Sequence, residues 1–261
     1  MSGPAIGAVC LDLSIGEPAL AEVRRHLGYP SGERPRAHIA RRIERVVAEA
    51  STAIRPRGAY AIHPVVGQKK RRLEIAGAAI SGDVSRYLGR VQRVGVVVAT
   101  AGDEVSVLAA RFAHEGDALA AWIVDAVGSW AAEAAADAVT ARLSAELEEG
   151  EALTLRYSPG YCGMAITQQR VLFDLVDAAG VGVTLMPSLL MHPLKSVSGI
   201  VGLGPHASAG AEGISTHSPC ERCPLVGCHM RRRPTWHEPR PAAASMRTLA
   251  STITGTLPTG G

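Results

Sequence analysis

The sequence predicts an α+β fold, with a mixed or antiparallel twisted sheet flanked by helices. Short apolar strands alternate with helices, and few segments show the pattern of a parallel crossover. The run Val94–Thr100 is apolar throughout, which indicates a strand buried on both faces. With 261 residues, 47% of them hydrophobic, the chain can form one large domain with an appendage.

The N-terminal part of the chain alternates between strand and helix patterns. Ile6–Leu13 and Ala59–Val66 are predicted strands, the second broken by Pro64. Glu17–Leu27 and Arg36–Ile54 carry apolar residues at helical spacing. Both helices are therefore expected to bury one face against the sheet or against each other.

The middle of the chain is mostly helical. A strand at Leu73–Ile80 precedes a short helix, Val84–Leu88, and Glu104–His114 forms another helix. Asp117–Leu147 is predicted as one long helix or two in tandem, interrupted near Gly128. The expected buried stripe of this long helix is Trp122, Ile123, Val127, Trp130 and Ala134.

The stretch from Arg156 to Gly204 is the most informative part of the sequence. A strand at Leu153–Tyr157 leads into the turn Pro159–Gly160, and a helix follows at Thr167–Ala178. A strand at Val181–Met186 and a Ser- and Gly-rich segment at Lys195–Gly204 complete it.

The Pro-Gly turn places a guanidinium, a phenol and a thiol close together, from Arg156, Tyr161 and Cys162. One interpretation is a small-molecule site, because a guanidinium can bind a carboxylate through two hydrogen bonds. The other is a plain turn in which Arg156 and Tyr161 only cap and pack. The local residues leave both interpretations open.

The spacing Arg-x-x-Pro-Gly-Tyr at Arg156–Tyr161, followed by Leu-x-x-Ser-x-x-Met-x-Pro-x-x-Ser-Val-Ser-Gly, resembles the reactivation domain of cobalamin-dependent methionine synthase. The matching run is Arg156–Gly199, with weaker similarity through Gly128–Asp137 back to Ala99–Glu104. The chain departs from that enzyme in two ways. It carries no recognisable methyl-acceptor, folate or cobalamin module, and it has an added cysteine cluster.

The resemblance implies a site for S-adenosylmethionine and a corrinoid. Arg156 would bind S-adenosylmethionine, and Tyr161 would be the catalytic residue that approaches the corrin from its upper side. Glu133 falls at the acidic position of a helix, although Glu148, Glu149 or Glu151 could serve instead. The remaining cofactor-binding residues would be Ser158, Pro159, Gly160, Ser196, Ser198 and Gly199. Ile200-Val201 stands where the enzyme has an aromatic residue, so one adenosyl contact is missing.

The region after Gly204 differs in composition and contains the spacing Cys220-x2-Cys223-x4-Cys228 followed by His229. Three thiolates this close indicate a metal site, with Cys162, His229, Cys10 or an exogenous group as fourth ligand. An iron–sulfur cluster is favoured over zinc, because reactivation of a corrinoid needs a low-potential electron and zinc has no redox chemistry. We therefore expect a domain at 1–205 and a metal-binding tail at 206–261, partly disordered after Pro234.

The predicted function is reductive reactivation of a corrinoid protein or cobalamin-dependent methyltransferase, with S-adenosylmethionine as methyl donor and a low-potential electron donor as further partner. One alternative is a non-catalytic corrinoid adaptor or chaperone, and another is a structural or metal-sensing protein; either would hold zinc in its tail. A net charge of +3 gives no support for nucleic-acid binding. No apolar run approaches ~18 residues and no signal peptide is evident, so we expect a cytoplasmic protein without a membrane segment.

Overall fold

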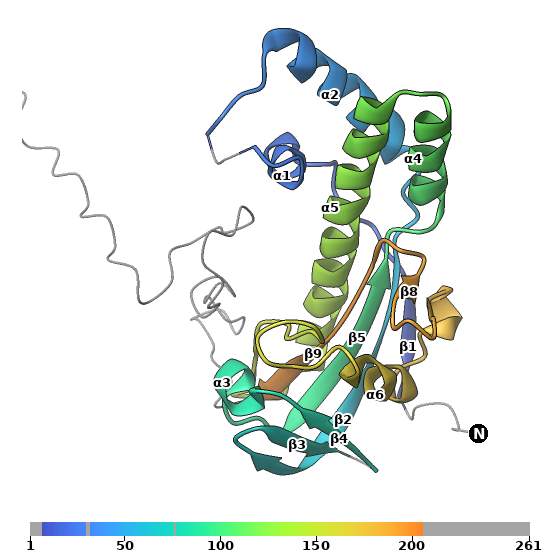
Figure 1. Cartoon of the computed structure of the whole chain (residues 1–261). Coiled ribbons are helices and arrows are strands. Elements are labelled where there is room, and N and C mark those ends of the chain that lie inside the picture. Colours follow the sequence, from blue (N-terminus) through green and yellow to red (C-terminus); the bar gives the residue numbers. More distant parts are fainter. Residues whose placement is uncertain (1–6, 30–31, 76, 206–261) are drawn as a thin grey trace, which may run out of the picture.

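The computed structural model describes residues 7–29, 32–75 and 77–205. Its main element is a seven-stranded sheet of order β4-β3-β2-β5-β9-β6, in which β1 also pairs with β2 and every paired ladder is antiparallel (Figure 1). The strands are β1 Val9–Asp12, β2 Arg57–Lys69, β3 Arg72–Ile75, β4 Ala78–Ser81, β5 Arg93–Thr100, β6 Ala152–Leu153 and β9 Ser196–Gly204. The prediction of an α+β fold with an antiparallel sheet is confirmed.

Six α-helices and a small hairpin surround the sheet in the described ranges. The helices are α1 Leu20–His26, α2 Ala37–Ser51, α3 Val84–Leu88, α4 Glu104–His114, α5 Ala118–Leu143 and α6 Gln168–Leu175. The hairpin joins β7 Thr184–Leu185 to β8 Met191–His192, and single 3₁₀ turns lie at Ser144–Glu146 and Ala179–Val181. No helix in these ranges is long and apolar enough to cross a membrane.

The two faces of the central strands are covered by different helices, because successive side chains of a strand point to opposite sides. Val96 and Ile200 belong to the cluster that contains Leu172 of α6. Val97 and Val201 belong to the cluster that contains Val139 of α5. Even-numbered residues of β5 and β9 therefore face α6, and odd-numbered residues face α5.

Helix α5 is the longest element and extends beyond the sheet (Figure 1). Its N-terminal half packs with α1, α2 and α4 in a separate core, while its C-terminal half packs on β5 and β9. Asp117 caps its start, since the carboxylate accepts a hydrogen bond of 3.0 Å from the backbone N–H of Ala120. Much of the buried face is alanine, which lets the helix approach the strands closely.

The alternative of two tandem helices is wrong, because α5 runs through Gly128 without a break. A Cβ atom on Gly128 would lie 2.9 Å from Cγ of Lys195, so this glycine makes room for a side chain that crosses the helix. The buried stripe is also partly wrong: Ile123 and Val127 are buried, but Trp122 is 55% exposed.

Strand β2 continues through Pro64, contrary to the predicted break. Val65 donates its N–H toward β5, so the missing N–H of Pro64 falls on the opposite flank. That flank is unpaired at this point, because β1 pairs only as far as Tyr60 and β3 pairs with β2 only from Val65 onward. The segment predicted as one strand at Leu73–Ile80 is instead the hairpin of β3 and β4, which turns at a glycine with φ +74°.

Candidate functional site

Arg156 lies beside β9, one residue before a bridge between Tyr157 and Ile200. Its Nη2 donates to Oε2 of Glu133 at 2.5 Å, and its Nη1 donates to Oδ1 of Asp137 at 3.3 Å. The Arg156 side chain is only 15% exposed. The Arg156 side chain therefore bridges the space between β9 and α5.

Gly199 leaves the space that the Arg156 side chain occupies. A Cβ atom at Gly199 would lie 2.7 Å from Cγ of Arg156 and 2.8 Å from Oγ of Ser158. Such contacts are too short for any real Cβ, so every residue with a side chain would displace Arg156. Gly199 is odd-numbered and faces α5, which explains why Arg156 reaches Glu133 rather than the α6 side.

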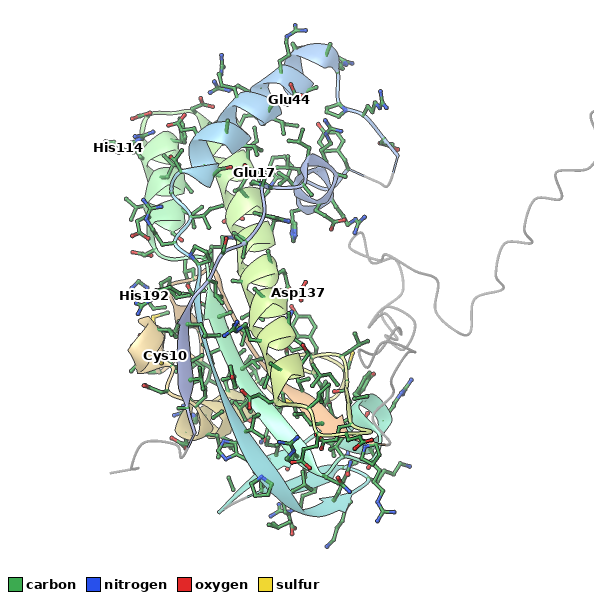
Figure 2. All side chains as sticks on the ribbon, turned by 180° about the vertical axis from the view of Figure 1, so that it is seen from behind. Cys10, Glu17, Glu44, His114, Asp137 and His192 are labelled. Carbon is green, nitrogen blue, oxygen red and sulfur yellow. The ribbon has the colours of Figure 1, made fainter. Side chains whose placement is uncertain are left out.

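The two carboxylates on α5 are open to solvent. Their side chains are 49% exposed for Glu133 and 75% exposed for Asp137, and Figure 2 labels Asp137 on this helix. The residues are four apart, which places them on one face of a helix. The predicted site includes Glu133 but not Asp137, although this spacing is visible in the sequence and could have added Asp137.

The turn after Arg156 is held by its backbone. Gly160 has φ +87°, a conformation that favours glycine, and its N–H donates to the carbonyl of Met164 at 2.8 Å. Tyr161 projects from this turn and its side chain is 69% exposed. Pro159 is buried beneath the turn. The phenol of Tyr161 is therefore accessible to a large binding partner.

Buried Tyr157 anchors the same turn. Its hydroxyl accepts a hydrogen bond from the N–H of Asp83 and donates one to the carbonyl of Cys162, both at 3.0 Å. The ring stacks on Tyr87 with centroids 4.8 Å apart. Burial raises the pKa of Tyr157, so its hydroxyl stays protonated and keeps donating.

Cys162 is half-buried beside Tyr87, and burial together with a hydrogen bond to Cys162 raises the pKa of Tyr87. Among residues 7–29, 32–75 and 77–205, no group of three or more His, Cys, Asp or Glu side chains could hold a metal ion. Cys220, Cys223, Cys228 and His229 lie outside the described residues. A metal site that combines them with Cys162 stays a prediction.

The two serines of the Ser- and Gly-rich segment do not share the surroundings of Arg156. Ser196 donates to the carbonyl of Pro193 at 2.7 Å. Ser198 is 3% exposed, faces α6, and accepts a hydrogen bond of 3.3 Å from Nε2 of Gln169. The structure therefore brings together Glu133, Arg156, Ser158 and Gly199, and places Ser198 on the other face of β9.

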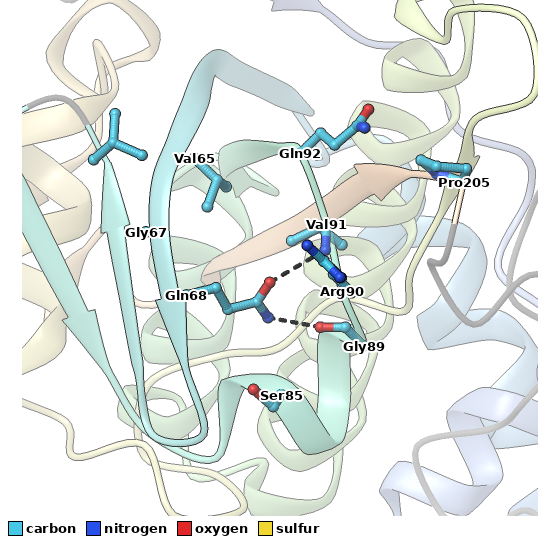
Figure 3. A pocket seen from close by; sticks show the side chains of 10 residues that line it. Val65, Gly67, Gln68, Ser85, Gly89, Arg90, Val91, Gln92 and Pro205 are labelled. Carbon is cyan, nitrogen blue, oxygen red and sulfur yellow. Dashed lines mark hydrogen bonds between the residues drawn. The ribbon is translucent and has the colours of Figure 1, made fainter.

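A separate hollow of about 930 Å³ lies between the β2 bulge and the loop before β5 (Figure 3). Gln68 spans one side of it, bonded through Nε2 to the Gly89 carbonyl at 2.6 Å and through Oε1 to the Val91 N–H at 3.3 Å. None of the predicted site residues lines this hollow. It gives no support for a ligand at Arg156.

The charge arrangement around Arg156 suits a small zwitterion. A guanidinium has five N–H donors, and the two carboxylates use two of them, so donors remain for an incoming carboxylate. The exposed oxygens of Glu133 and Asp137 can attract a cation on the same ligand. A plain structural role would not require both acids to face solvent.

Comparisons with protein families and with solved structures both give matches. The model of the family described as vitamin B12 dependent methionine synthase, activation domain, matches residues 51–211. The solved structure of the MetH reactivation domain bound to AdoHcy is similar over 80% of this chain and 81% of that one, with a TM-score of 0.58 and 17% sequence identity. No curated protein matches the chain.

Proposed function

The chain belongs to the family of vitamin B12 dependent methionine synthase activation domains, and on that premise we propose that it binds S-adenosylmethionine at Arg156 and supports reductive reactivation of a corrinoid. The corrinoid would be carried by a methionine synthase or a related corrinoid protein. The location in the cytoplasm remains a prediction.

The observation that carries this proposal is the Arg156 cluster. A guanidinium that is 15% exposed has both Nη atoms on carboxylates that are themselves exposed. S-adenosylmethionine carries a carboxylate, an ammonium and a sulfonium. Its carboxylate would pair with Arg156, and Glu133 and Asp137 would attract its cations.

The proposed reaction has two steps. A low-potential donor gives one electron to cob(II)alamin and forms cob(I)alamin. The cobalt(I) electron pair then attacks the methyl carbon of S-adenosylmethionine, a cobalt–carbon bond forms, the sulfur–carbon bond breaks, and S-adenosylhomocysteine leaves. Tyr161, exposed at the turn, would lie against the corrin and help exclude water from the methyl group.

We test the ligand site by titration calorimetry with S-adenosylmethionine. The proposal predicts binding by the wild type and a loss of at least ~10-fold in affinity, about 1.4 kcal/mol, for Arg156→Ala. Arg170→Ala is the matched control, because Arg170 is exposed on α6 and makes no contact with the cluster. A wild type that does not bind, or equal affinities in the wild type and Arg156→Ala, contradicts the assignment.

The source of the electron is the second part of the proposal. An iron–sulfur cluster on Cys220, Cys223 and Cys228 would relay it, since the potentials of such clusters extend down to about −700 mV. Cys162 would complete the ligand set. Elemental analysis of protein purified without oxygen tests this, with iron and sulfide expected and stoichiometric zinc contradicting the relay. Replacement of Cys162 by Ser, compared with Cys10→Ser, tests the fourth ligand.

One observation favours a second candidate function, a corrinoid adaptor without S-adenosylmethionine affinity. Ile200 and Val201, which stand where the enzyme has an aromatic residue, are both fully buried and offer no surface to an adenosyl group. The calorimetric titration separates the two functions. An adaptor would bind a corrinoid protein but give no heat with S-adenosylmethionine.

A further inference from the structure

Lys195, the residue just before β9, makes a second contact with α5 that the Arg156 site does not include. Its Nζ donates to Oγ of Ser129 at 2.9 Å and lies 2.7 Å from Oδ1 of Asp125. The side chain is 17% exposed. Its backbone carbonyl accepts hydrogen bonds from the N–H of Ala101 at 2.8 Å and from Oγ1 of Thr100 at 3.3 Å. Lys195 therefore joins the end of β5, the start of β9 and α5.

The contacts of Lys195 and Arg156 on α5 fall on a single stripe. Asp125, Ser129, Glu133 and Asp137 are spaced by four residues, so they follow one another along one face of the helix. Lys195 holds the first two, and Arg156 holds the last two. The helix and the strand are thus linked at two points about 6 Å apart along the helix axis, measured from Ser129 to Glu133.

A glycine makes room for each cation. Gly199 leaves the space on β9 that Arg156 crosses, and Gly128 leaves the space on α5 that Lys195 crosses. Between these contacts α5 presents the buried alanines Ala131, Ala132, Ala135 and Ala136. An alanine surface has no long side chains to interdigitate, so apolar packing alone resists sliding along the helix axis only weakly.

We infer that Lys195 is a positioning residue for the Arg156 site. It fixes the register of α5 against β9 so that Glu133 and Asp137 stand opposite the guanidinium. This inference rests on the proposed function for the ligand, but the effect on the Arg156 side chain does not require a ligand. Gly128 contributes to the same positioning, because the absence of a side chain there leaves room for Lys195.

Lys195→Met removes the ammonium and keeps the length of the chain. We expect a loss of at least ~5-fold in S-adenosylmethionine affinity while the protein remains folded. Lys195→Arg should restore most of the affinity, since a guanidinium can reach the same two partners. Lys70→Met is the matched control, because Lys70 is exposed in the turn between β2 and β3. Gly128→Ala should also weaken binding, although alanine favours a helix more than glycine does.

A ligand-free measurement keeps the inference separate from the proposed function. We measure the ¹⁵N relaxation and solvent exchange of the Arg156 Nε–H by NMR, assigned with Arg156→Lys. Lys195→Met and Gly128→Ala should increase the mobility and exchange rate of this group at least ~2-fold, and Lys70→Met should not. If the Arg156 resonance is unchanged in both variants, the inference is wrong, whether or not the wild type binds S-adenosylmethionine. If the resonance changes but the wild type does not bind S-adenosylmethionine, the inference holds and only the proposed function is wrong.

Discussion

Two arginines beside β9 each hold carboxylates, but only one pair is closed to solvent. Arg93 on β5 binds Glu151, whose side chain is 5% exposed, and also donates to the carbonyl of Glu146 at 2.8 Å. Arg156 is buried to a similar degree, but Glu133 and Asp137 are 49% and 75% exposed. Arg93 also lies 3.5 Å from the exposed Glu148, but its nearest acid is enclosed, whereas both acids of Arg156 are open. On the proposed function, this exposure of the nearest acids is what distinguishes a ligand site from a structural ion pair.

The electrostatics of the closed pair follow from its burial. Burial opposes ionisation of Glu151, but hydrogen bonds from Arg93 and from the Glu148 N–H outweigh it and hold the pKa of Glu151 below 4.5. A lowered pKa means that the ionised acid stabilises the folded state. This contribution is complete above about pH 4.5 and is lost as pH falls through the lower folded-state pKa.

The largest effect on stability is expected from breaking the closed pair. Glu151→Gln leaves Arg93 without its main partner and should lower the free energy of unfolding by about 1–3 kcal/mol at neutral pH. Urea unfolding at about pH 7 and about pH 3 measures this. The wild type and the variant should converge at low pH. A difference that persists in acid would show that the pair does not act through the charge of Glu151.

Filling the space that Gly199 leaves for Arg156 is expected to have the next largest effect on stability. Gly199→Ala places a methyl group 2.7 Å from Cγ of Arg156, which should cost about 1–3 kcal/mol of stability and weaken S-adenosylmethionine binding. Gly16→Ala is the control, because a Cβ atom there has no neighbour within 4 Å. Thermal unfolding and calorimetry measure both quantities. Unaltered binding by Gly199→Ala would place the ligand elsewhere.

Removing a charge from the open pair should barely affect stability. Glu133→Gln and Asp137→Asn should each change the free energy of unfolding by less than about 1 kcal/mol, because exposed ion pairs contribute little. Both should nevertheless reduce S-adenosylmethionine affinity by about 10-fold, or ~1.4 kcal/mol. Glu149→Gln, in the exposed loop after α5, serves as control. Should the two variants lose stability but bind normally, the acids would be structural like Glu151.

The smallest effect on stability is expected at the turn. Tyr161→Ala removes a side chain that is 69% exposed and should change stability by less than about 0.5 kcal/mol. S-adenosylmethionine affinity should stay the same while the rate of corrinoid methylation falls, because the proposed function places the exposed Tyr161 against the corrinoid rather than against S-adenosylmethionine. Leu190→Ala, another exposed residue, is the control. A normal methylation rate in Tyr161→Ala would remove Tyr161 from the site.

Residue patterns predicted the positions of the helices better than the contacts that individual side chains make. Helix α4 has the predicted bounds, because its periodic apolar residues and acidic start are local signals. Gly128 leaves one long helix and two tandem helices both open in the sequence, since a glycine weakens a helical pattern locally. Its role in the structure depends on Lys195, which lies 67 residues later in the chain. The Ser-Val-Ser-Gly run predicts that Ser198 and Gly199 contact the same ligand, but alternation within β9 places them on opposite faces of the strand. Pairing of distant segments decides such contacts, and no local pattern reveals it.

The most direct test of the central claim compares the two arginines in one experiment. S-adenosylhomocysteine is titrated into ¹⁵N-labelled protein while the Nε–H resonances of Arg156 and Arg93 are followed by NMR. The open carboxylates predict that the Arg156 resonance shifts in a saturable way and that the Arg93 resonance stays in place. If the Arg156 resonance does not move, or if Arg93 responds in its place, the ligand does not bind between α5 and β9.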